Sequence, residues 1–360
     1  MTQKTNNVCK ERKMYKEFLL SHHRSYPLMR AEDYIKLIYQ SEYGAHSKVD
    51  ALKALTFIEK ECLQLSGGKN VSLCEDISPT LSRVNLLPYS KEHFSLPLLV
   101  GFFARSYEEG NEENLFEKLE EFCLLCESKS LNLAPFAVRN LVNKYKLKPC
   151  ALSHSLTYTK NYFPHYRVIK KDYADILRLF GAIEGNLDKG TLLVAIDGDS
   201  ASGKSRYGKV IKDFYGQRCN LFHTDDFFLP KERKTQERLS QLGGNIDYEA
   251  LSLLIKDILR GEEVSFTPFD CSSQSYKNKI TVKPAQINII EGVYSAHSSL
   301  RKYYNIIADF NIKCCEQQRR ILSRDGWERL ADYNKLWLPL EKAYLKDLRE
   351  NNRHLLTFAF

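Results

Sequence analysis

Eight residues near the middle of the chain constrain its fold more than any other segment. They fit the pattern G-x-x-x-x-G-K-[ST] at every fixed position, as Gly198, Asp199, Ser200, Ala201, Ser202, Gly203, Lys204 and Ser205. The apolar run 192–196 comes directly before them, and residues 204–214 can form a helix after them. A strand, a glycine-rich turn and a helix in this order are the setting in which the pattern binds phosphate.

The residue types of this turn suit a nucleoside triphosphate. Glycines let the backbone curl so that successive N–H groups point at phosphate oxygens. The helix that follows adds the positive end of its dipole. We expect Lys204 to bridge the β- and γ-phosphates of ATP and the Ser205 hydroxyl to bind Mg²⁺. All eight residues are therefore predicted to bind the cofactor; the alternative is a glycine-rich turn without a ligand.

The pattern of apolar residues around the turn predicts an α/β fold. Strand-like runs at 192–196, 219–223, 287–290 and 306–312 alternate with helical segments at 204–214 and 247–260. Two more helices are expected up to about residue 350, with a break or kink at Pro339. Such alternation is typical of a parallel sheet with helices on both faces, here a P-loop NTPase fold. The tail 354–360 is either a further strand or a truncated sheet edge.

The first part of the chain has a different pattern. Helical spacing is found at 31–44, 51–65, 111–126 and 135–145, with few alternating strand patterns. We therefore expect a mostly helical domain over 1–165 and the P-loop domain over 166–360, with a helix at 172–185 leading into the second. Cys123 and Cys126 lie on an apolar helix face, which favours core packing over a metal site.

Acidic residues follow two of the expected strands. Asp225 and Asp226 come after the second strand, and Glu291 ends the strand at 287–290. Carboxyl ends of parallel strands are where open α/β sheets bind ligands. One carboxylate of the pair can deprotonate an attacking hydroxyl, and Asp226 and Glu291 can serve the metal together with Ser205. The alternatives are an Asp-Asp turn or helix cap and an exposed strand end.

Taken in order, the motifs at 198–205, 224–228, 245–248 and 290–294 resemble the uridine kinase group of P-loop kinases. That group includes nicotinamide riboside kinase, bacterial pantothenate kinase and phosphoribulokinase. The resemblance covers about 192–345. It implies that Asp225 is the base for the substrate hydroxyl, that Asp247 holds ribose hydroxyls and that Glu291 follows the Walker-B strand. Asp247 could equally cap the helix that follows it.

The same resemblance places a substrate-base loop around Gln274. Uridine kinases usually carry a histidine there, so this departure puts a pyrimidine substrate in doubt. A glutamine can still pair with an amide-like edge, because it offers a donor and an acceptor. Phe228 and Tyr276, like Phe227, could stack on a base or could simply pack in the core.

A mobile helical lid follows the fourth strand in this kinase group and delivers arginines to the phosphates. The segment 314–326 contains Arg319, Arg320 and Arg324, and the last two are four residues apart on one helix face. Arginine can hold two phosphate oxygens and always stays charged. Arg320 and Arg324 are therefore predicted to be catalytic, with a solvated basic face as the alternative. Trp337, Leu338, Leu340 and Tyr344 are expected to pack against the sheet.

Composition narrows the partners and the cellular location. A net charge of +8 suits an anionic small ligand and is too mild to indicate nucleic-acid binding. The ten cysteines are scattered through the chain and are expected to be reduced thiols. No signal peptide or membrane-length apolar run is found, so we expect a cytoplasmic protein with no membrane partner. A homo-oligomer is an open alternative.

The sequence thus predicts an ATP- and Mg²⁺-dependent kinase that phosphorylates a hydroxyl of a nucleoside or a similar metabolite. A second hypothesis is an ATP-binding regulatory NTPase with the helical domain as its output. A third is a kinase fold without activity. Neither Asn278-Lys279 nor Asn334-Lys335 is followed by the aspartate of a guanine-reading N-K-x-D motif, which argues against a GTPase.

Overall fold

The computed structural model describes residues 15–45, 50–65, 71–270, 272–352 and 354–360. The chain forms two compact units, Met1–Asp175 and Ile176–Phe360. The division lies ten residues later than the sequence predicts, because β3 (Tyr166–Lys170) pairs with a strand of the N-terminal unit. The helix expected at 172–185 is accordingly two short helices with Ile176 between them.

The N-terminal unit is mostly helical, as predicted. Its helices are α2 (Ala31–Tyr43), α3 (Ala51–Leu63), α4 (Leu86–Lys91), α5 (Leu96–Ala104), α6 (Glu112–Glu127), α7 (Pro135–Lys146), α8 (Leu156–Tyr162) and α9 (Lys171–Asp175). The structure confirms the four helices expected from spacing, α2, α3, α6 and α7. Gly44 ends α2 at a φ of 61°, and the Asn111 side chain caps α6 by accepting from the Glu113 N–H.

This unit also contains a small antiparallel sheet that the sequence analysis did not predict. Its strands, in the order β1-β2-β3, are β1 (Cys74–Asp76), β2 (Leu81–Asn85) and β3. All five residues of β2 are buried, including Ser82 and Arg83, so the polar–apolar alternation that marks a half-exposed strand is missing. Cys123 and Cys126 are buried in the core of the unit, as expected.

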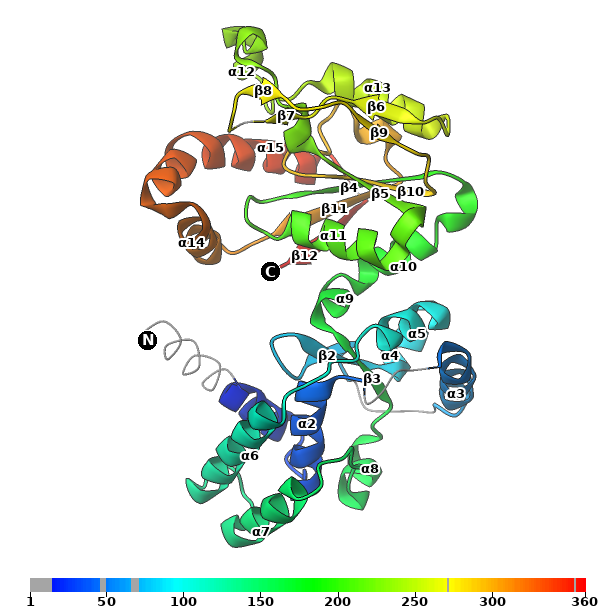
Figure 1. Ribbon diagram of the computed structural model, residues 1–360, viewed down its shortest axis with the longest axis vertical. Helices are drawn as coiled ribbons and strands as arrows, with labels where there is room; N and C mark the ends of the chain where they lie inside the picture. Colours follow the sequence, from blue (N-terminus) through cyan, green and yellow to red (C-terminus); the bar gives the residue numbers. More distant parts are fainter. Residues whose placement is uncertain (1–14, 46–49, 66–70, 271, 353) are drawn as a thin grey trace. The chain divides into compact units, whose positions relative to one another are not determined.

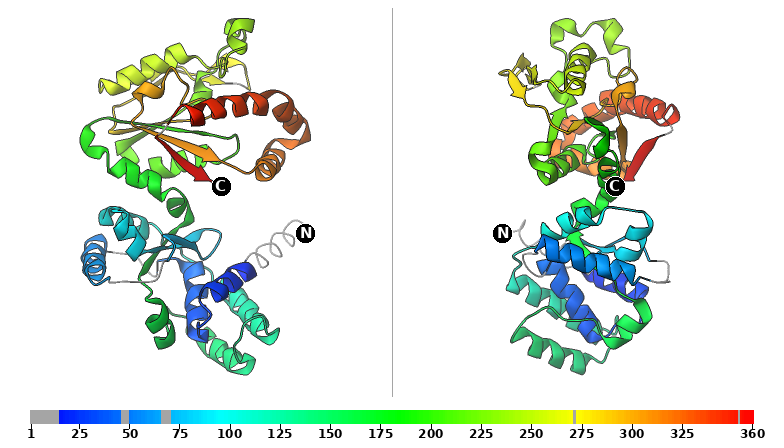
Figure 2. Two further views of the ribbon diagram at one scale, coloured as in Figure 1. Left: turned by 180° about the vertical axis from the view of Figure 1, so that it is seen from behind. Right: turned by 90° about the vertical axis from the view of Figure 1, so that its right-hand side faces the viewer.

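The C-terminal unit contains a five-stranded parallel sheet. Its strands are β4 (Leu192–Gly198), β5 (Cys219–His223), β10 (Ile287–Glu291), β11 (Ile306–Asn311) and β12 (Leu355–Ala359). They lie in the order β12-β11-β4-β10-β5, and every neighbouring pair is parallel. The tail is therefore a strand: Figure 2 shows β12, in red, beside β11 at the sheet edge.

Helices cover both faces of this sheet, which explains why β4 is buried along its whole length. The helices of the unit are α10 (Leu177–Glu184), α11 (Lys204–Tyr215), α12 (Gln236–Leu239), α13 (Tyr248–Leu259), α14 (Cys314–Asp332) and α15 (Leu338–Glu350). Figure 1 shows α10 and α11 against one face and α13 and α15 against the other. On the second face Leu193 and Ala195 of β4 share a core with Ile255 and Leu345.

Shorter elements complete the unit. Two small antiparallel pairs are formed by β6 (Val264–Phe266) with β9 (Ile280–Val282) and by β7 (Phe269–Asp270) with β8 (Ser275–Tyr276). Single helical turns of 3₁₀ type are η1 (Leu187–Lys189), η2 (Gly216–Arg218), η3 (Thr224–Phe227), η4 (Lys231–Arg233) and η5 (Arg301–Tyr303). A π-helical turn, η6 (Tyr333–Trp337), joins α14 to α15.

The α-helical geometry is interrupted just before Pro339, as expected. The π-helical turn η6 ends at Trp337, and α15 begins at Leu338 with Pro339 in its first turn, where proline is well tolerated. A further break falls at Gly326, whose φ of 82° and ψ of 178° lie outside the helical geometry of α14. Among the described residues no helix has the length and apolar character needed to cross a bilayer. The eight cysteines of the described ranges are all free thiols.

Candidate active site

A cleft of about 1260 Å³ lies where the carboxyl ends of β4, β5 and β10 meet. These strand ends carry the segments that the sequence analysis selected. Twelve of the predicted site residues line the cleft: Ser200, Ala201, Gly203, Lys204, Ser205, Asp225, Asp226, Phe228, Gln274, Glu291, Arg320 and Arg324. The fold therefore gathers groups that are up to 124 positions apart in the sequence into one space.

The turn after β4 needs its glycines for steric reasons. Gly198 has a φ of 125°, and a Cβ atom there would lie 2.2 Å from the Phe310 carbonyl oxygen. Gly203 precedes α11 with a φ of 102°, and Ala201 also has a positive φ, of 61°. Only glycine enters most of this backbone region without strain. The turn is thus tightly curled against β11, as a phosphate cradle requires.

The phosphate-binding turn contains a buried cation and a buried hydroxyl. Lys204 is buried, with 7% of its surface exposed, and its Nζ donates to the Gly198 and Asp199 carbonyl oxygens at 2.9 and 2.8 Å. The Ser202 hydroxyl is buried and has no hydrogen-bond partner among the described residues. Lys204 lines the cleft, and a buried cation beside a curled turn fits a polyphosphate, which offers many acceptor oxygens.

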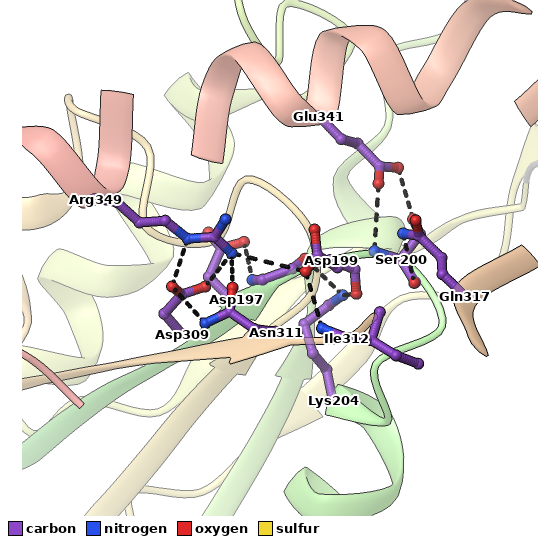
Figure 3. A network of polar contacts seen from close by, with 11 residues as sticks. Asp197, Asp199, Ser200, Lys204, Asp309, Asn311, Ile312, Gln317, Glu341 and Arg349 are labelled. Atoms are coloured by element: carbon purple, nitrogen blue, oxygen red, sulfur yellow. Dashed lines mark hydrogen bonds and ion pairs between the residues drawn. The ribbon is translucent and has the colours of Figure 1, made fainter. Parts of the chain in front are cut away.

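Side chains from α14 and α15 hold this turn in place (Figure 3). Glu341, from α15, accepts from the Ser200 hydroxyl at 2.6 Å and from the Ser200 N–H at 3.3 Å. Gln317, from α14, donates to the Ser200 carbonyl oxygen at 3.0 Å. Glu341 also lines the cleft. Sequence analysis missed it because nothing in a helical segment 141 residues away signals contact with the turn.

Three of the residues predicted to bind the cofactor are parts of the turn but do not line the cleft: Gly198, Asp199 and Ser202. The Asp199 carboxylate accepts from the Ile312 N–H at 3.0 Å and lies 3.7 Å from Arg349. Its N–H donates to the Phe310 carbonyl oxygen. Asp199 therefore connects the turn to β11 and α15, and both its carboxylate and its backbone N–H are engaged in these contacts.

The acidic residues face the phosphate-binding turn from the neighbouring strands. Asp225 and Asp226 lie in η3, directly after β5, and Glu291 ends β10. The surrounding protein limits the hydration of Asp225 and, with the charge of Glu291, raises its pKa above the ordinary aspartate value. Burial also raises the pKa of Asp226. Raised carboxylate pKa values in a cleft are typical of functional sites.

His223 is a further member of this group that the sequence analysis did not select. Its Nδ1 lies 2.5 Å from Glu291 Oε1, and this contact raises the pKa of the imidazole. Glu291 itself is only 4% exposed. His223, at the end of the neighbouring strand β5, therefore orients the Glu291 carboxylate, which is one of the predicted metal ligands. In the described ranges no cluster of three or more His, Cys, Asp or Glu side chains forms a self-contained metal site.

The residues predicted to contact the substrate are divided. Phe228 and Gln274 line the cleft, whereas Asp247 and Tyr276 do not. Asp247 caps α13 by accepting from the Ala250 N–H at 3.1 Å and is paired with Arg233. The capping alternative is thus present in the structure. Tyr276 is half exposed and packs edge-on against Phe269, which does line the cleft.

Three arginines of α14 line the cleft, Arg320, Arg324 and Arg329, and Arg319 does not. Arg320 donates to the Ala201 carbonyl oxygen at 3.1 Å and to Glu316 at 2.7 Å. Arg324 contacts Asp325 and the Tyr333 hydroxyl. Arg319 pairs with Glu316 and is absent from the cleft lining. Both arginines predicted from helical spacing therefore line the cleft, together with Arg329, which the sequence analysis did not select.

The expectation for residues 337–344 was partly wrong. Leu338 and Tyr344 are buried, and Tyr344 donates to Asp197 at 2.6 Å. Trp337 and Leu340, however, line the cleft. They lie in the π-helical turn and the first turn of α15. Their hydrophobicity alone could not distinguish a cleft wall from a core position.

The fold of the C-terminal unit follows from this geometry. A parallel sheet covered on both faces carries a G-x-x-x-x-G-K-S turn between its central strand β4 and the helix α11, which is the P-loop NTPase arrangement. The ordered motifs of the C-terminal unit resemble those of the uridine kinase group of P-loop kinases.

Several solved structures to which the chain is similar are described as kinases. The chain is similar to a possible uridine kinase from Bacillus stearothermophilus, with 19% identity and a TM-score of 0.37, over 50% of this chain and 99% of that one. It is also similar to D-glycerate 3-kinase from Cryptococcus neoformans, with 13% identity and a TM-score of 0.39, over 52% and 95%. No protein-family model and no curated protein sequence matches the chain.

Proposed function

We propose that the C-terminal unit transfers the terminal phosphoryl group of ATP to a hydroxyl of a nucleoside or a similar small metabolite. The observation that carries this proposal is the convergence of Lys204, Asp225 and Glu291 on one cleft behind a curled phosphate-binding turn. A nucleotide-binding turn alone would serve many functions. A carboxylate beside it, placed where an acceptor can enter, is what phosphoryl transfer to an alcohol requires.

The residues around the turn would hold the nucleotide and its metal ion. Backbone N–H groups of the turn and the Lys204 ammonium bind phosphate oxygens, and the start of α11 adds its positive dipole end. The Ser205 hydroxyl and the carboxylates of Asp226 and Glu291 supply the oxygen ligands that Mg²⁺ prefers. When bound, Mg²⁺ neutralises charge on the phosphates and orients them.

Asp225 would act as the base for the acceptor hydroxyl. Its raised pKa brings the carboxyl closer to neutral pH, where a base accepts a proton more effectively. Arg320 and Arg324 would stabilise the negative charge on the transferred group and help to exclude water from the cleft. Phe228 and Gln274 would contact the acceptor, by ring stacking and by amide hydrogen bonds. Asp247 and Tyr276 do not line the cleft. We include them in the proposal as further residues that would contact the acceptor.

The test is acceptor-dependent release of ADP by the purified protein. A panel of nucleosides, nicotinamide riboside, pantothenate, glycerate and sugar alcohols should contain at least one compound that stimulates turnover of Mg-ATP. Replacing Asp225→Asn should then lower kcat by about 10²- to 10⁴-fold, because the general base is lost. Asp213→Asn, in an exposed ion pair with Lys209 on α11, is the matched control and should leave kcat unchanged.

Two results would contradict the proposal. Full activity of the Asp225→Asn variant would remove Asp225 from the mechanism. Tight binding of Mg-ATP without stimulation by any acceptor would instead favour the regulatory NTPase hypothesis, in which the N-terminal unit is the output.

A further inference from the structure

A second cavity, of about 260 Å³, lies entirely within the N-terminal unit. Its walls are dominated by four tyrosines, Tyr26, Tyr158, Tyr162 and Tyr166, together with Glu75 and Arg83. We propose that this cavity binds a small carboxylic acid. Arg83 holds the carboxylate, and the tyrosine rings enclose its apolar or aromatic body. The proposal is independent of the kinase function proposed for the other unit.

Arg83 is the observation that carries the proposal. The side chain comes from the central strand β2 and is only 1% exposed. Its guanidinium stacks on the Tyr166 ring, 4.4 Å from the centroid, and Nη2 donates to Gln40 Oε1 at 2.9 Å. Nε is buried without an acceptor among the described residues. A guanidinium has five N–H donors, and burying them unpaired costs free energy.

Glu75 does not satisfy this guanidinium. Its nearest oxygen lies 4.0 Å from Arg83 Nη1, beyond hydrogen-bond distance, and it accepts from the Tyr26 hydroxyl at 3.3 Å. Arg83 therefore lacks the paired hydrogen bonds that usually accompany a buried arginine. A ligand carboxylate could accept two parallel N–H bonds from the guanidinium edge, which is the strong geometry for this pair.

A chain of hydrogen bonds fixes the wall behind Arg83. Asp33, which is fully buried, contacts His154 Nδ1 at 3.0 Å, and His154 Nε2 lies 2.7 Å from the Tyr166 hydroxyl. That hydroxyl donates to Gln40 Oε1, the same oxygen that accepts from Arg83. The guanidinium and the Tyr166 ring are thus held in position before any ligand arrives. Preorganisation of this kind lowers the cost of binding.

Charge and size select the ligand class. Arg83 faces a partial counter-charge in Glu75, and His165, the other basic residue of the lining, is engaged by Glu61 at 2.7 Å. A singly charged carboxylate matches one available cation, whereas a phosphate dianion would need a second. The volume is below the range of about 300–1000 Å³ for drug-sized ligands, so the occupant is a small molecule. Tyrosine faces suit an aromatic or branched apolar body.

The test uses benzoate as the probe and ligand-observed NMR titration of the full-length protein. Benzoate should bind, and benzamide, its neutral analogue, should bind at least about 10-fold more weakly. Arg83→Gln should lower benzoate affinity by at least about 10-fold. Leu87→Trp, which fills the cavity from its rim in α4 and leaves Arg83 in place, should have the same effect. The Leu87→Trp variant therefore still tests the proposal if the Arg83→Gln variant fails to fold.

Two variants serve as controls. Arg139→Gln, which removes a surface arginine paired with Glu120 and Glu127 in the same unit, should bind benzoate normally. Lys204→Ala should also bind it normally, which separates this cavity from the phosphate-binding cleft. The proposal is overturned if neither benzoate nor the aliphatic acid isovalerate binds at millimolar concentration. Equal binding by Arg83→Gln, or tighter binding of phenyl phosphate than of benzoate, would overturn it too.

Discussion

Glu341 places a negative charge at the phosphate-binding turn itself. The carboxylate is only 6% exposed and accepts from both the N–H and the hydroxyl of Ser200. An N–H in such a turn is one of the donors that phosphate oxygens use. Burial raises the pKa of the Glu341 carboxyl, although Ser200 and Lys204 oppose the shift. A carboxylate therefore competes with a phosphate for the same donor, and its protonation state affects the stability of the turn.

The raised pKa of Glu341 predicts a specific dependence of stability on pH. An acid whose pKa is higher in the folded state favours folding when it is protonated. The free energy of unfolding should therefore fall as pH rises from the ordinary glutamate pKa, about 4.3, through the raised folded-state pKa. Glu341→Gln keeps an acceptor for Ser200 and removes this titration. The difference in Tm, wild type minus variant, should decrease across that window. A difference that does not vary with pH would contradict the prediction.

The helix α14 contacts the phosphate-binding turn. Gln317 and Arg320 both contact carbonyl oxygens of the turn, at Ser200 and Ala201. Gly326 interrupts the helix at a φ of 82°, and a Cβ atom there would meet no neighbour within 4 Å. The glycine is thus needed for its backbone conformation and not for close packing. Residues on both sides of this break line the cleft, Arg324 before it and Trp337 and Leu340 after it.

Three of the arginines of α14 allow a matched test of the predicted contacts with the phosphoryl group. Arg320→Gln and Arg324→Gln should each lower kcat by about 100-fold, because each removes a positive charge that would stabilise the transferred phosphoryl group. Arg319→Gln removes the same charge from the same helix, but its side chain lies outside the cleft lining, so kcat should stay near the wild-type value. Steady-state ADP release at saturating ATP and acceptor measures the effect. Equal losses in all three variants would indicate a general effect of helix charge.

At the scale of the whole molecule, the chain divides into two compact units. The core of the C-terminal unit groups side chains of β4, β10, α13 and α15, and the N-terminal core groups those of α2, α6 and α7. Each sheet is also completed by strands of its own unit. The separate cavity around Arg83 gives the N-terminal unit a site that does not depend on the phosphate-binding cleft.

Residues 176–360 should therefore fold and act without the N-terminal unit. We expect a single cooperative unfolding transition and a kcat/KM for the acceptor within about threefold of that of the full chain, as for a domain with its own core. Circular dichroism and ADP release measure the two properties. Residues 1–175 alone should release no ADP. Failure of 176–360 to fold would show that the units depend on each other.

The sequence by itself determined the main strands and helices of the C-terminal unit. The apolar runs, the glycine-rich turn and the acidic strand ends predicted the parallel sheet and a cleft that brings Lys204, Asp225 and Glu291 together, because local patterns report burial and turn geometry. The same patterns could not find β2, whose buried arginine hides the strand signal. Nor could they separate Asp247 as a helix cap from Asp247 as a ligand-binding residue.

Only the tertiary structure decided which distant side chains meet. Glu341 reaches Ser200 across 141 residues, His223 orients Glu291 from the neighbouring strand, and Arg83 lines a cavity with residues from three other parts of its unit. Such contacts depend on how helices and strands pack, and packing is set by the whole arrangement of apolar surfaces. A linear pattern of residues records which face of an element is buried but not what that face meets.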